Sequence, residues 1–214
     1  MARRAFLRVV AAAFLAAVPG LSAAQSSYEE FLKAVNQGDA KTVEGFLNRG
    51  LDPDTADLEG NTVLMIAARL GHQGVVSLLI SRKAGVAKRS SHGDTALMMA
   101  SLKGHLAIAK LLVAHGAEVN HPGWTPLHYA AFEGRAEVIK FLLEKGADKN
   151  ALAPNGYSAL MLAARGGYVE ASRAILYADP DIMIKGPKGE TALALAKAGN
   201  FQELEELLKR AGAY

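Results

Sequence analysis

The 214-residue sequence contains no cysteine, and this absence excludes several kinds of structure and chemistry. A disulfide framework, a zinc–thiolate centre and a cysteine nucleophile all need a residue that the chain does not have. No run of about 20 apolar residues occurs either, so the sequence predicts no stable membrane insertion. It has no nucleophile-elbow, HExxH, P-loop or GxGxxG motif, so we expect neither an enzyme nor a cofactor. Half of the residues are hydrophobic, which is too many for a disordered polar tail.

Excess charge of one sign is also missing from most of the chain. The formal net charge of +3 arises from Arg3, Arg4 and Arg8, because the first 24 residues contain no acid. The other 21 basic residues balance the 21 acidic residues. Residues 25–214 therefore carry no net charge that would attract nucleic acid or anionic lipid, so we expect neither as a partner.

Residues 1–24 have the pattern of a signal peptide. A basic start is followed by ten apolar residues at 9–18 and then by small residues up to Ala24. We predict cleavage after Ala24, a mature chain of residues 25–214, and a periplasmic or secreted location. The Arg3-Arg4 pair leaves both the general export route and the twin-arginine route open.

The rest of the chain repeats itself with a period near 33 residues. Similar segments begin at Gly60, Gly93, Gly123, Gly156 and Gly189, at steps of 33, 30, 33 and 33 residues. The same steps relate an alanine column (Ala67, Ala100, Ala130, Ala163, Ala196), a turn column (Gly71, Gly104, Gly134, Gly167, Asn200) and an apolar column (Phe46, Leu79, Leu112, Leu142, Ile175, Leu208). Three columns that share one period indicate a stacked repeat protein.

Each column suits one part of a helix–turn–helix unit. A Thr or Ser before the first apolar run can cap a helix, and Pro126 fits the first helical position. The turn glycines, and Asn200 in the last unit, suit the left-handed conformation that ends a helix. We therefore expect stacked helix pairs joined by turns or β-hairpins.

The segment Thr125-Pro126-Leu127-His128-Tyr129-Ala130-Ala131 matches the signature of the ankyrin repeat in full, and the other units match it in part. The chain resembles this family, in its small exported bacterial form, over residues 28–212. The resemblance implies an all-α repeat fold, an ankyrin-type α-solenoid. We expect six units: an N-terminal cap (28–56), four repeats (57–89, 90–119, 120–152 and 153–185) and a C-terminal cap (186–214).

Three positions depart from the repeat pattern. The 30-residue step shortens the hairpin that ends at Gly123 by three residues. Lys83 stands where later units have Gly116 and Gly146, so its turn either adopts a strained left-handed conformation or forms differently around Gly85. Asp179-Pro180 replaces Gly-Ala in the fifth unit.

The family resemblance implies a non-enzymatic protein-binding module that engages an exported partner through its concave surface and hairpin loops. It places three aromatic residues on the concave side, with charged residues at matching helix positions: Trp124, Phe132, Tyr157, Arg69, Lys103, Glu133 and Arg165. Such a combination is typical of binding hot spots. We expect a monomer when the protein is free.

An alternative function is a metal- or haem-handling accessory that supports an envelope or stress-protection enzyme. It depends on His92 and His121, which lie near the hairpin tips of neighbouring units. His72, His105 and His128 occupy positions where the family uses histidine structurally, bonded to nearby backbone.

Overall fold

The computed structural model describes the backbone of residues 19–214 and the side chains from residue 26 onward. That part of the chain contains twelve helices and almost no β-structure, with two isolated antiparallel bridges, Ala56–Thr62 and Leu152–Ser158. The expected all-α solenoid is therefore confirmed. The helices are α2 (Pro19–Gln37), α3 (Ala40–Asn48), α4 (Val63–Leu70), α5 (Gln73–Ser81), α6 (Ala96–Lys103), α7 (Leu106–Ala114), α8 (Pro126–Phe132), α9 (Ala136–Glu144), α10 (Ala159–Arg165), α11 (Val169–Leu176), α12 (Ala192–Ala198) and α13 (Gln202–Arg210).

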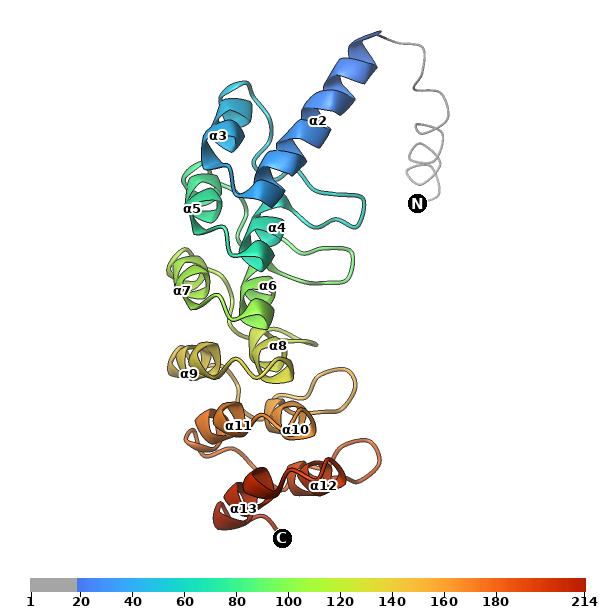
Figure 1. Ribbon diagram of the computed structural model, residues 1–214, viewed down its shortest axis with the longest axis vertical. Helices are drawn as coiled ribbons and strands as arrows, with labels where there is room; N and C mark the ends of the chain where they lie inside the picture. Colours follow the sequence, from blue (N-terminus) through green and yellow to red (C-terminus); the bar gives the residue numbers. More distant parts are fainter. Residues whose placement is uncertain (1–18) are drawn as a thin grey trace.

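The helices form six pairs stacked in chain order, as Figure 1 shows. The even-numbered helices make one column, which we call the inner helices, and the odd-numbered helices make the other, the outer helices. Hairpin-like loops lie before α4, α6, α8, α10 and α12 and project to one side of the inner helices. The loop before α8 projects least, as its shorter sequence predicts.

The inner helices begin at capping hydroxyl groups, as the sequence predicts. The side chains of Thr62, Thr95, Thr125, Ser158 and Thr191 each accept a hydrogen bond from the backbone amide three residues later. Pro126 stands at the first turn of α8, where its missing N–H leaves no hydrogen bond unmade.

The regular spacing of the apolar columns along the chain makes one continuous core. Every alanine of the alanine column is fully buried, which lets neighbouring inner helices approach closely. The apolar column of the outer helices is also buried, from Phe46 through Leu112 to Leu208. Each unit thus shares its apolar surface with its neighbours, and stability comes from the stacking of the units.

The helix ends adopt the predicted left-handed conformation. The whole turn column has positive φ, from +83° at Gly71 to +57° at Asn200. Lys83 and Asp179 also have positive φ, +65° and +53°, in the place that Gly116 and Gly146 take in other units. The turn at Lys83 is therefore of the strained left-handed type.

The predicted signal peptide, residues 1–24, lies mostly outside the described residues. The predicted cleavage point after Ala24 falls within the backbone of α2. None of the described helices is both long and apolar enough to cross a membrane.

Candidate functional site: the inner face and its aromatic residues

The shortened hairpin before α8 brings Trp124 against its own helix. The Trp124 ring packs edge-to-face on Tyr129, with 5.7 Å between ring centroids, and on His128, with 5.9 Å between centroids. Trp124 is only partly exposed and contacts the core. The short loop holds the indole over α8, so only part of the predicted binding residue Trp124 is accessible to a partner.

Tyr129 extends this aromatic cluster to the preceding unit. Its hydroxyl donates a hydrogen bond of 2.5 Å to the Oδ1 atom of Asp94. Burial raises the pKa of Tyr129 well above its ordinary value, and the bond to the Asp94 carboxylate raises it further. The phenol is thus a fixed hydrogen-bond donor at neutral pH. Tyr129 occupies the variable position of the family signature, so no sequence motif points to it.

Tyr157 forms an equivalent contact with the following unit. Its hydroxyl donates a 2.6 Å hydrogen bond to the Oε1 atom of Glu190, and the guanidinium carbon of Arg165 lies 5.9 Å from the centre of its ring. The hydrogen bond is the main cause that raises the pKa of Tyr157 and lowers the pKa of Glu190. These contacts fix the Tyr157 ring on the surface.

The remaining predicted residues lie at the other end of the inner helices. Phe132 is the last residue of α8, and 53% of its surface is exposed. Glu133 follows it and forms an ion pair with Arg135, with 3.3 Å between Nη2 and Oε2. Arg69, Lys103 and Arg165 are exposed in the last turns of α4, α6 and α10.

The seven predicted residues therefore form two rows along the column of inner helices, and we call the surface that carries these two rows the inner face. Trp124 and Tyr157 belong to the row at the start of the inner helices, whereas Phe132 belongs to the row at their ends. The two rows are about 10 Å apart, since α8 has two turns. Arg165 spans the two rows. Its backbone lies in the row at the helix ends, and its guanidinium group lies beside the ring of Tyr157, in the other row.

The histidines that follow the turn glycines are structural. The Nε2 atom of His72 lies 2.9 Å from the carbonyl oxygen of Asn36, and that of His105 lies 3.1 Å from the carbonyl oxygen of Arg69. Each ring thus bonds to the backbone of the preceding unit. His128 is buried, and its two ring nitrogens contact Thr125 and the carbonyl oxygen of Ala151. Burial is the main cause that lowers the pKa of His128.

The other histidines do not assemble a metal site. The Nδ1 atom of His121 lies 3.0 Å from the carbonyl oxygen of Pro122, and that of His92 lies 3.4 Å from the hydroxyl of Ser91. In the part of the chain that the structure describes, no three His, Cys, Asp or Glu side chains come close enough to hold a metal ion. The Nε2 atom of His121 is buried without a hydrogen-bond partner among the described residues, but it belongs to no such group.

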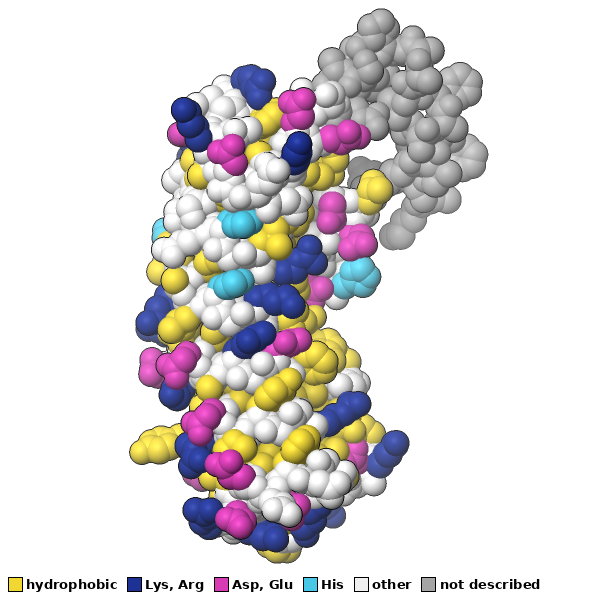
Figure 2. Space-filling view, in the orientation of Figure 1, with side chains coloured by type: hydrophobic (Ala, Val, Ile, Leu, Met, Phe, Trp, Pro, Cys, Tyr) yellow, Lys and Arg dark blue, Asp and Glu magenta, His cyan; other side chains and the backbone are white. Residues whose placement is uncertain are grey.

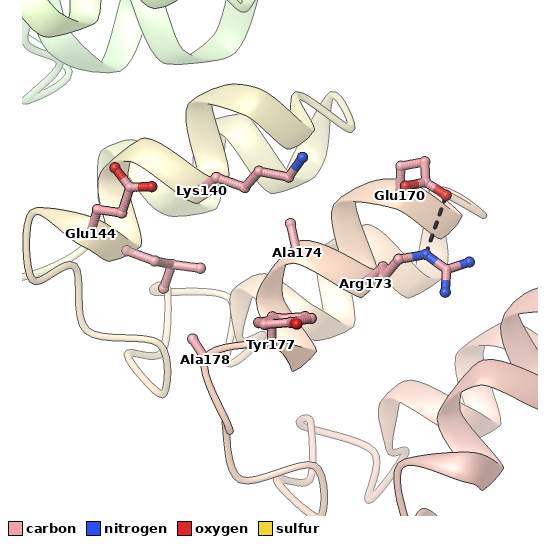
Figure 3. A pocket seen from close by; sticks show the side chains of 8 residues that line it. Lys140, Glu144, Glu170, Arg173, Ala174, Tyr177 and Ala178 are labelled. Atoms are coloured by element: carbon pink, nitrogen blue, oxygen red, sulfur yellow. Dashed lines mark hydrogen bonds and ion pairs between the residues drawn. The ribbon is translucent and has the colours of Figure 1, made fainter.

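A second surface feature lies between the outer helices and was not foreseen from the sequence. A groove of about 560 Å³ separates α9 from α11 (Figure 3). Tyr177, 92% exposed, lies at one end of it. Its cationic residues already have partners: Lys140 pairs with Glu137 at 2.7 Å, and Arg173 pairs with Glu170 at 3.3 Å.

The stacked helix pairs and the buried alanine column define a solenoid repeat protein. The chain belongs to the ankyrin-repeat family, because the family model for ankyrin repeats in three copies matches residues 31–122, 87–153 and 118–186. Ankyrin repeats are protein–protein interaction modules and are in general non-enzymatic.

Three relatives illustrate the breadth of this similarity. The chain is 32% identical over 114 residues to mouse ankyrin repeat and SAM domain-containing protein 6, covering 52% of this chain and 10% of that protein. It is 37% identical over 127 residues to mouse protein phosphatase 1 regulatory subunit 27, covering 59% and 63%. It is 33% identical over 134 residues to an ankyrin repeat-containing protein of Treponema pallidum (strain Nichols), covering 63% and 35%. The chain thus spans less than two thirds of each of these relatives.

Proposed function

We propose that the protein is a non-enzymatic binding module that acts outside the cytoplasm and engages an exported protein through its inner face and hairpin loops. The main support is the exposed ring of Phe132, which is flanked along the inner face by the exposed cations Arg69, Lys103 and Arg165. Aromatic residues, phenylalanine included, and arginine are enriched at the cores of protein–protein interfaces.

The fixed aromatic residues support the same function. Trp124 is held by ring packing, and Tyr129 and Tyr157 are held by hydrogen bonds to carboxylates of neighbouring units. Side chains that are already ordered lose little conformational entropy when a partner binds. The row at the start of the inner helices is thus pre-organised for binding.

The binding proposal is tested with a tagged full-length chain crosslinked in the cells that produce it. A captured protein that is lost with Phe132→Ala and retained with Tyr177→Ala would support it. Tyr177 is a matched control, because it is an exposed aromatic residue on the outer helices. Equal capture by both variants would refute the role of the inner face.

The location is tested by cell fractionation. We expect a mature protein that starts at Gln25 in the periplasmic or secreted fraction. Replacement of Arg3 and Arg4 by lysine should block export only if the twin-arginine route is used. A full-length protein that stays in the cytoplasm would refute the location and leave the inner-face binding test valid.

A further inference from the structure

The middle outer helices differ from the others in their charge. Helix α5 has no charged residue and α7 has one, Lys110, whereas α3, α9, α11 and α13 each have two or more. Several apolar side chains of the middle outer helices are only partly buried: Leu78, Ile80, Leu106, Leu111 and Val113. Figure 2 shows hydrophobic side chains at the left edge of the molecule, where these outer helices lie. The outer surface therefore has an apolar region at its centre.

A groove of about 490 Å³ lies beside this region, between α7 and α9. Val113, Ala114 and Phe141 supply its apolar lining. Phe141 is only 7% exposed although it lines the groove, so its side chain lies at the bottom. The Nζ atoms of Lys110 and Lys145 lie 6.0 and 5.9 Å from the centre of this ring. Two ammonium groups therefore flank one buried aromatic ring.

These two lysines are not neutralised by the fold. Within residues 26–214, neither side chain forms an ion pair or a hydrogen bond with another residue. The groove contains a single acidic residue, Glu144, so its lining carries one net positive charge. The neighbouring α9–α11 groove differs, because its two cations and two carboxylates balance.

We propose that the groove between α7 and α9 is a second docking site, which binds an acidic amphipathic helix of a partner protein. One apolar side chain of that helix would contact Val113 and Phe141, and carboxylates beside it would pair with Lys110 and Lys145. Apolar contact gives such a helix its affinity, and charge complementarity selects an acidic helix over a basic one. This site lies on the opposite layer from the inner face and does not depend on the function proposed above.

A membrane surface fits the groove less well than a helix does. Val113 is only partly exposed, and Phe141 is too buried to enter a bilayer. Peripheral membrane binding needs apolar side chains that project from the surface. Among the residues with described side chains, the most exposed large hydrophobic ones, Leu58, Tyr177 and Tyr214, lie outside this groove. A protruding helix can enter the groove, whereas a flat surface cannot.

The test uses two fluorescent peptides of about 18 residues, long enough to form a helix when bound. Both have leucine at positions i, i+3, i+4 and i+7, and the remaining positions are alanine with glutamate in one peptide and with lysine in the other. Fluorescence anisotropy with the full chain should show binding of the glutamate peptide and much weaker binding of the lysine peptide.

Charge reversal provides the decisive comparison. The double variant Lys110→Glu/Lys145→Glu should bind the glutamate peptide about tenfold or more weakly and should gain affinity for the lysine peptide. The control Lys185→Glu/Lys188→Glu has the same change in net charge, on the exposed loop before α12, and should bind like the wild type. Ala114→Trp, at an exposed position that lines the groove, should block both peptides without unfolding the chain.

Four results would overturn the proposal: equal binding of the two peptides, binding unchanged by the charge reversal, no binding of the glutamate peptide at about 1 mM, or loss of binding in the control double variant. Two further results would assign the groove to another occupant. Lysine-dependent sedimentation with phosphatidylglycerol vesicles would indicate a membrane, and self-association that Ala114→Trp abolishes would indicate a second copy of the chain.

Discussion

Two glycines with positive φ, Gly71 and Gly116, give a prediction about stability in which Gly116 is the control for Gly71. At Gly71, with φ +83°, an added Cβ would lie 2.7 Å from the Cε1 atom of His105. At Gly116, with φ +89°, an added Cβ would meet no atom within 4 Å. Alanine at either position is strained by the backbone, but only at Gly71 does it also collide with the neighbouring unit.

The two costs can be separated. Alanine in a left-handed conformation lowers the free energy of unfolding by about 1–2 kcal/mol through backbone strain. Its smaller conformational entropy in the unfolded chain, relative to glycine, offsets about 0.4–1 kcal/mol of this loss. Gly116→Ala should therefore lower the free energy of unfolding by about 1 kcal/mol. Gly71→Ala should also displace the His105 ring and break its bond to Arg69, which adds about 2 kcal/mol or more.

Urea unfolding followed by circular dichroism measures both losses. Because repeat arrays can unfold in parts, tryptophan fluorescence from Trp124 should be recorded beside it. In a His105→Ala background, Gly71→Ala should cost about as little as Gly116→Ala, since the colliding ring is gone. Equal losses for the two glycines in the wild-type background would refute the reasoning.

Two other predictions concern strain and pH. Lys83→Gly should raise the free energy of unfolding by up to about 1 kcal/mol, because it removes the strain of φ +65°; a lower urea midpoint would contradict this. Burial lowers the pKa of His128 in the folded protein. As the pH falls below about 6.5, His128 is therefore protonated first in the unfolded chain. The free energy of unfolding then decreases by up to about 1.4 kcal/mol per pH unit. The advantage of the wild type over His128→Gln in urea unfolding should therefore shrink from pH 7 to pH 5, and a constant difference would refute the assignment.

The parts of the fold that follow from local chemistry could be predicted from the sequence. Capping by Thr62 and its equivalents, and the left-handed turns at Gly71 and Asn200, involve residues within a few positions of each other. The turn at Lys83 was left open by the sequence. In the structure, the backbone amide of Lys83 donates a hydrogen bond to the carbonyl oxygen of Ile80, and that of Ala84 donates one to Leu79. These two hydrogen bonds end the helix and hold Lys83 at positive φ.

The parts of the candidate site that depend on contacts between units could not be predicted. The hydrogen bond from Tyr129 to Asp94 joins residues 35 positions apart, and this pair occurs in one unit only, so no repeated pattern points to it. The partial burial of Trp124 follows from how the shortened hairpin folds back, which its length alone does not specify. The grooves on either side of α9 are formed by side chains of three outer helices, so no single sequence motif predicts them.

The inner face and the α7–α9 groove meet in the same unit, which gives a final prediction. Helices α8 and α9 carry Phe132 on one surface and Phe141 and Lys145 on the other. In a stacked array, stability is the sum of the units and of their shared interfaces, so a ligand at the α7–α9 groove adds directly to one such interface. Binding of the glutamate peptide should then slow amide hydrogen exchange in α6 to α9, including amides on the inner helices that the peptide does not touch. Slower exchange limited to the residues of the groove would show that the two layers open independently, and that occupation of one surface leaves the other unchanged.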